Sequence, residues 1–154
     1  EQTIVMGCRP MDFPAMPAGI ESADWADVPH PPTADDGPVM VLHVIRFEDA
    51  EAAHVTPTEM EAYTSAAAVS ASKHGGRIAG WFAVEGTIIG DGRAWHQVRF
   101  NEFPSKAAFM AVVFDPDRLA AQKDHREKAI ADTYTMIVRA TLDDLTASLS
   151  PPFA

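Results

Sequence analysis

The sequence predicts an α+β fold of the ferredoxin-like type, in which a four-stranded antiparallel sheet carries its helices on one face. Four segments are rich in β-branched and aromatic residues, as strands are: residues 39–47, 77–89, 94–103 and 132–142. Helical segments fill the first and third intervals, so the order is β-α-β-β-α-β. At 154 residues, the chain is long enough for one domain with a proper core.

The first strand, VMVLHVIRF, is followed by a loop and by a helix expected over residues 57–73. Thr56 or Thr58 is expected to cap this helix, with Pro57 near its first turn. Its buried stripe is predicted to consist of Met60, Tyr63, Ala67 and either Ala71 or Ser70. His74-Gly75-Gly76 ends the helix, because glycine readily adopts the left-handed backbone conformation of a C-cap.

The second strand alternates over residues 77–89, with Gly80 and Gly86 as expected bend or bulge sites. A Gly-Asp-Gly turn at 90–92 leads into the third strand, which Pro104 ends because proline lacks a backbone N–H. Ser105 is expected to cap a helix over residues 105–113. A second helical piece over 117–130 and a last strand over 132–142 complete the domain.

Residues 1–38 differ in composition from the rest. They hold seven of the twelve prolines, and seven acidic residues against the single basic Arg9. They also carry more apolar residues than a solvated linker would. We therefore expect an ordered arm that lies across a folded surface, its own or a partner's, with a short strand at residues 3–6; a flexible leader is the alternative. The expected organisation is an arm (1–38), a domain (39–142) and a tail (143–154).

Both faces of the predicted sheet are apolar. The first strand offers Val41 and Ile45 on one face and Leu42 and Val44 on the other. Helices of one chain can cover only one of these faces, and a face that meets water should be polar. The sequence therefore predicts a homodimer in which two sheets pack face to face as a dimeric α/β barrel.

A motif series supports this architecture: residues 101–105 (NEFPS), 107–109 (AAF), 114–117 (FDPD) and His125-Arg126, with Gly75-Gly76-Arg77 before the second strand. Over residues 39–142 the chain resembles a family of small ferredoxin-like proteins known only as a domain of unknown function. The resemblance implies a dimeric α/β barrel and assigns no ligand.

Charge and cysteine content exclude several classes of function. The net charge of −10 argues against nucleic acid or an anionic membrane as a partner. A single cysteine, Cys8, excludes an internal disulfide. Low cysteine content is typical of the cytoplasm, which is the expected location. Because the chain begins with Glu1 rather than Met, a secreted or anchored form stays open.

No phosphate-binding or flavin-type motif is present, so no cofactor is expected. His43, His54, His96 and Glu85 are the residues that would bind a metal, but they lack the spacing of known metal motifs, and we expect no metal site.

Arg126 is the leading candidate for a site residue, because it lies in the centre of an apolar helical stripe. It forms either a structural ion pair with Glu85 or Glu102, or an anchor for a carboxylate or enolate-like oxygen. On the third strand the more apolar set is expected to face the helices, which places His96 beside Arg126 and turns Trp95 and Arg99 toward a partner sheet.

His43 is expected to join His96 and Arg126 as a third catalytic candidate, because the first and third strands are neighbours in this topology; for each histidine, a purely structural position is the alternative. The expected ligand-contacting residues are Tyr63, Trp81, Glu85, Phe100 and Tyr134. For the tyrosines, filling the core is the alternative to donating a proton.

Three functions remain open. The first, by analogy of fold, is a cofactor-independent oxygenase, isomerase or lyase that acts on a small aromatic or keto acid. The second is a non-catalytic protein that binds such a ligand. The third is a structural dimer whose polar core residues pair with one another.

Overall fold

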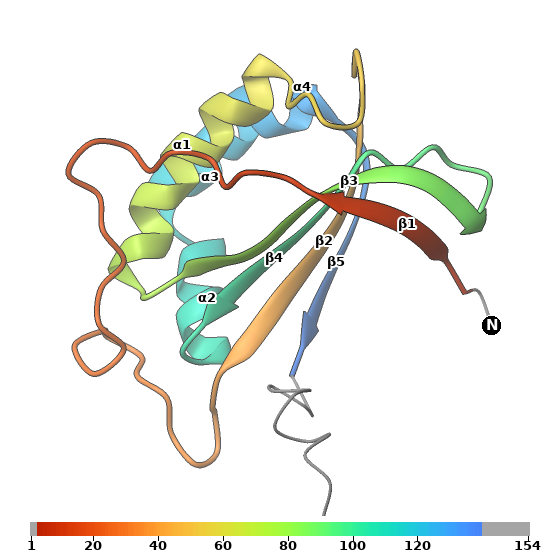
Figure 1. The fold of residues 1–154 in the computed structure, drawn as a ribbon. Helices are drawn as coiled ribbons and strands as arrows, with labels where there is room; N and C mark the ends of the chain where they lie inside the picture. The colour runs from red at the N-terminus through yellow and green to blue at the C-terminus, as the bar shows by residue number, and fades with distance from the viewer. Residues whose placement is uncertain (1–2, 140–154) are drawn as a thin grey trace, which may run out of the picture.

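The computed structural model describes residues 3–139 and contains one five-stranded antiparallel sheet in the order β1-β3-β4-β2-β5. The strands are β1 (Val5–Pro10), β2 (Val39–Phe47), β3 (Arg77–Ile89), β4 (Gln97–Phe103) and β5 (Ile130–Val138). The helices are α1 (Thr58–Lys73), α2 (Lys106–Val113), α3 (Pro116–Ala121), the π-helical turn η1 (Gln122–Arg126) and α4 (Glu127–Ala129). Without β1, this is the ferredoxin-like order of elements and strands, with the helices on one side of the sheet (Figure 1).

The sheet has one strand more than the sequence predicted. β1 comes from the N-terminal arm and pairs antiparallel with β3, so the expected strand at residues 3–6 lies at 5–10 instead. Beyond β1 the arm passes the edge of the sheet and α1 (Figure 1), held by the hydrogen bond from Ala23 N to Ser72 O at 2.9 Å. Trp25 Nε1 donates to Gly75 O at 2.8 Å. The arm is thus ordered on the chain's own surface.

Short-range signals in the sequence set the helix ends. Ser105 Oγ accepts a hydrogen bond from Ala108 N at 3.0 Å, which confirms the predicted cap of α2. Gly75 has φ +76° directly after α1, as the C-cap prediction requires. The predicted threonine cap of α1 is wrong: Pro57 occupies the N-cap position, and no side chain caps this helix.

Side chains from β2, β4 and the helices form the core on the helix side of the sheet. One cluster joins Val39, Val41 and Phe103 to Val112 of α2; another joins Ile45 and Phe47 to Met60 of α1. On the other side, which we call the open face, Val44, Val84, Trp95 and Val98 form a third cluster, partly covered by Ile4 and Met6 of the arm.

A bulge in β3 changes which side chains face the helices. Ile78 is opposite Asn101 and Gly80 is opposite Phe100, so Ala79 is an extra residue in the ladder. Ile78 and Trp81 consequently lie on the same face, although strict alternation would separate them. The expected bulge near Gly86 is also present, since Gly7 and Cys8 pair with Gly86 and Val84.

The predicted end of the last strand (140–142) and the tail (143–154) lie outside the described residues. Within residues 3–139, no helix has the length and apolar character that crossing a membrane requires.

Candidate functional site

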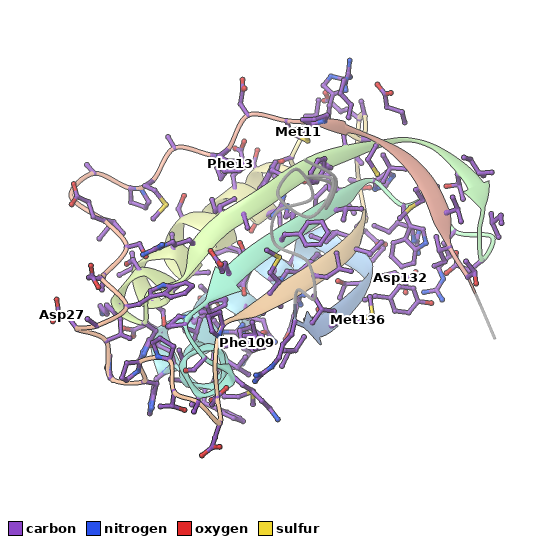
Figure 2. The ribbon with its side chains drawn as sticks, turned by 60° about the horizontal axis from the view of Figure 1, so that its bottom comes forward. Met11, Phe13, Asp27, Phe109, Asp132 and Met136 are labelled. Carbon is purple, nitrogen blue, oxygen red and sulfur yellow. The ribbon has the colours of Figure 1, made fainter. Side chains whose placement is uncertain are left out.

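A cavity of about 560 Å³ lies between the helices and the sheet. Its sheet wall comes from β2, β3, β4 and β5, and its helix wall from α1, α2, α3 and η1. The arm contributes Phe13, Pro14 and Met16 to the lining. Phe13 lies on the arm where it passes the edge of β3 (Figure 2). Most of the lining is apolar, as is common for sites that bind small organic molecules.

The charged groups that line this cavity are all basic. Arg77, Arg99, Arg118 and Arg126 contribute to the lining, with His43 beside them. Within residues 3–139, no Asp or Glu lines the cavity, and no ion pair joins Arg99, Arg118 or Arg126 to a carboxylate. This is unusual for Arg99, which is buried, because buried arginines are normally paired with acidic groups; Arg118 and Arg126 are half-buried.

Arg99 projects from the central strand β4 and is only 3% exposed. Arg99 donates two hydrogen bonds to Gln97 Oε1, from Nε at 3.1 Å and from Nη2 at 2.6 Å. The guanidinium carbon lies 3.7 Å from the ring centroid of Trp81, in a cation–π contact. Burial, and then the charge of Arg126, lowers the pKa of Arg99 to about 9, so the side chain is still charged at neutral pH.

Gln97 is itself completely buried and held by the loop before α1. Its Nε2 donates to Ala53 O at 3.0 Å and to Thr56 Oγ1 at 3.2 Å. The amide therefore fixes Arg99 through a neutral acceptor. A glutamate at this position would neutralise the guanidinium, whereas glutamine orients it and leaves its charge in place.

The helix wall presents two more arginines. Arg118 Nη1 donates to Tyr63 Oη at 3.1 Å and Nη2 to Gln122 Oε1 at 2.8 Å. Arg126 lies at the end of the π-helical turn, with its guanidinium carbon 5.8 Å from the Tyr63 ring centroid. Turns of this kind are frequent at functional sites. Burial lowers the pKa of Arg126; the charge of Arg118 lowers it further, whereas Tyr63 and Glu127 raise it.

His43 lies on β2, on the same side of the sheet as Arg99. Its Nδ1 is 3.2 Å from Thr135 Oγ1 of β5. Burial, and then the positive charges of Arg126, Arg99 and Arg118, lowers the pKa of His43 to about 4. At neutral pH this imidazole is uncharged, so it can either donate or accept a proton in the cavity.

The structure brings half of the sequence-predicted site residues together: His43, Tyr63, Trp81 and Arg126 all line the cavity. His96 is not among the lining residues, so its expected position beside Arg126 is wrong. Its Nδ1 accepts the backbone N–H of Phe47 at 2.9 Å, and its ring stacks on Phe47. The expectation failed because β4 presents its polar set, not its apolar one, to the helices.

The other three predicted ligand contacts also lie away from the cavity. Glu85 forms an exposed ion pair with Arg9 at 3.2 Å, so it is not the partner of Arg126. Phe100 packs edge-on against Phe82, at the cluster on the open face. Tyr134 packs against that cluster too and accepts a hydrogen bond from Arg93 Nη2 at 2.7 Å.

Sequence reasoning missed Arg99 and Arg118 as site residues, although two signals pointed to them. Gln97, Arg99 and Asn101 form a polar stripe on one face of an otherwise apolar central strand. Arg118, Gln122 and Arg126 recur every four residues, which places them on one face of a helix.

Within the described range, no three His, Cys, Asp or Glu side chains gather closely enough to hold a metal ion.

No protein-family model matches the sequence, and the comparison with curated proteins also finds no match. Among solved structures, the chain is similar to RPA0582, a protein of unknown function from Rhodopseudomonas palustris. The identity is 26% and the TM-score 0.60, over 70% of this chain and 86% of that chain.

The methylated form of RPA0582 gives 28% identity and a TM-score of 0.58, over 70% and 84% of the two chains. A dabb family protein with a ferredoxin-like fold from Mesorhizobium loti shares 15% identity at a TM-score of 0.49, over 68% of this chain and 97% of that chain. The similarity to RPA0582 supports the fold and carries no activity with it. The resemblance to the family with the EFPS motif stays a prediction.

Proposed function

We propose that this protein binds a small organic acid with an apolar or aromatic body in the cavity between helices and sheet. The observation that supports this most directly is that Arg99, Arg118 and Arg126 share one largely apolar cavity in which no described acidic side chain takes part. Removing a charge from water is costly unless a partner offsets the cost. A carboxylate ligand would supply that partner, with the geometry that guanidinium groups bind best.

Thermal unfolding in the presence of carboxylic acids tests this proposal. Acids that bind are expected to raise the melting temperature with concentration, whereas their neutral amides are not. Arg126→Gln should reduce the shift, because Arg126 makes no hydrogen bond to another described side chain and is free to meet the ligand. Arg9→Gln, at an exposed ion pair on β1, is the matched control and should leave the shift unchanged. Equal stabilisation by acids and amides would contradict the proposal.

A second candidate function is cofactor-independent proton transfer on a keto acid, of the isomerase or lyase type. It rests on the position of His43, an uncharged imidazole that lines the same cavity as Arg99, Arg118 and Arg126. His43 would take a proton from the carbon beside the carbonyl, and an arginine would stabilise the enolate oxygen. Exchange of that proton in D₂O, followed by NMR, is expected for wild type and lost in His43→Gln. Binding without exchange would favour a non-catalytic role.

We also propose that two chains pair through their open faces. Met136 and Val138 of β5 are 45% and 37% exposed there, beside the partly buried Met40 and Leu42 of β2. Met136 projects from this side of the sheet (Figure 2). A homodimer is expected in light scattering at low micromolar concentration, and Met136→Lys should weaken it. A monomer under these conditions would refute the pairing.

A further inference from the structure

Three of the four arginines that line the cavity fall into two sets, one on each wall, while the exposed Arg77 stacks on Trp25. Arg99 belongs to the sheet and is fixed by Gln97 and Trp81. Arg118 belongs to the helices and is fixed by Tyr63 and Gln122, with Arg126 two turns further on. The walls face each other across an interior with apolar side chains, among them Ile45, Met60, Ile78 and Phe109.

Each set includes guanidinium N–H groups that have no strong hydrogen bond to another side chain. Arg99 Nη1 has only a contact of 3.5 Å to Thr64 Oγ1. On the helix wall, Nη1 and Nη2 of Arg118 already donate to Tyr63 and Gln122, and its Nε is buried out of reach of a ligand. The guanidinium of Arg126 contacts the Tyr63 ring at 5.8 Å. Donors therefore remain available on both walls.

The acceptors that hold these arginines are all neutral: an amide of Gln97, an amide of Gln122 and the hydroxyl groups of Tyr63 and Thr64. They orient the guanidinium groups without cancelling their charge. A ligand with one negative charge would leave two of the charges on Arg99, Arg118 and Arg126 without a partner. Two acidic groups, one near each wall, would offset more of the positive charge of these arginines.

We propose that the ligand is a dianionic organic acid with two separate acidic groups, one bound by Arg99 on the sheet and the other by Arg118 and Arg126 on the helices. Its apolar body spans the interior between them. This inference rests on the proposed function and specifies the class of ligand for the same cavity.

Diacids and their monomethyl esters provide the test, because each pair has the same body and differs by one charge. The diacid probes are isophthalate and the unbranched α,ω-dicarboxylates from glutarate to azelate, and each is compared with its monomethyl ester. Phenyl phosphate is added as a dianion that carries both charges on one group. Binding is measured by isothermal titration calorimetry with the whole chain in a buffer free of phosphate and carboxylates.

At least one diacid is expected to bind about 10- to 100-fold more tightly than its monoester, since a second charge-assisted contact is added. Arg126→Gln should remove most of this advantage, and Arg9→Gln should preserve it. If every monoester binds within about threefold of its diacid, or if phenyl phosphate binds more tightly than all diacids, the inference is wrong and the proposed binding of acids stands. If none of the probes binds, both are overturned.

Discussion

Gln97→Glu tests whether the charge of Arg99 is what the cavity offers to a ligand. The substitution keeps the shape of the side chain and the acceptor atom that Arg99 Nε and Nη2 contact. It adds one negative charge directly against the guanidinium. Arg99 then already has an anionic partner and is no longer available to a bound acid.

The size of the effect follows from the geometry. A ligand carboxylate on the far edge of the Arg99 guanidinium would lie ~7 Å from the carboxylate that the substitution introduces, the width of the group plus two hydrogen bonds. At an effective dielectric constant of about 20, two like charges at ~7 Å repel by about 2 kcal/mol, which weakens binding about 30-fold.

Calorimetric titration of the best acid from the screen into wild type and Gln97→Glu measures this loss. Loss of the amide donor to Ala53 O also affects stability, so the variant must first show a cooperative unfolding transition. Thr87→Glu, which adds the same charge at an exposed position of β3, is the control and should bind as wild type does. A folded Gln97→Glu that binds the acid within about threefold of wild type would refute the role assigned to Arg99.

Three further outcomes are expected. His43 has a folded-state pKa of about 4, below its usual 6.5, so its neutral form stabilises the folded protein. This contribution to the free energy of unfolding should be complete above pH 6.5 and should decrease as the pH falls toward 4. In urea titrations, His43→Gln should lack up to about 3 kcal/mol of the pH dependence that wild type shows. Gly75→Ala should lower the free energy of unfolding by about 2 kcal/mol, because φ is +76° and the new methyl group would lie 2.8 Å from Trp25 Cδ1; no loss in chemical denaturation would contradict this. Gly80→Ala should cost about 1–3 kcal/mol, since its Cβ would lie 2.7 Å from the Phe82 ring, whereas Gly86→Ala, with no atom within 4 Å, should cost little; equal melting temperatures of these two variants would refute the packing described at the bulge.

The sequence was sufficient for the fold because the signals for the elements are local. The alternating apolar strands, the Ser105 cap and the glycine after α1 act within a few residues of where they lie, and all appear in the structure. The pairing of β1 was harder to foresee, because it joins the arm to β3 across more than seventy residues. No periodicity within the arm identifies the strand edge that receives it.

The cavity could be predicted only in part, because the faces of β4 were assigned by polarity. Gln97, Arg99 and Asn101 looked like the outer set, and His96 like the inner one. A polar stripe can face inward when it lines a cavity and has neutral partners, as Gln97 provides for Arg99. Gln97 is in turn held by Ala53 and Thr56, which lie in a loop far from β4 in sequence.

The extra residue in β3 has a consequence for how relatives of this chain diverge. Because Ala79 lies outside the ladder, Ile78 and Trp81 both contribute to the cavity. Deleting Ala79 would leave Ile78 opposite Asn101 and Trp81 opposite Arg99 in a regular ladder, so both side chains would still face the cavity. Two sequences that differ by one residue in the length of this strand can therefore keep the same cavity-lining side chains, because the bulge absorbs the extra residue.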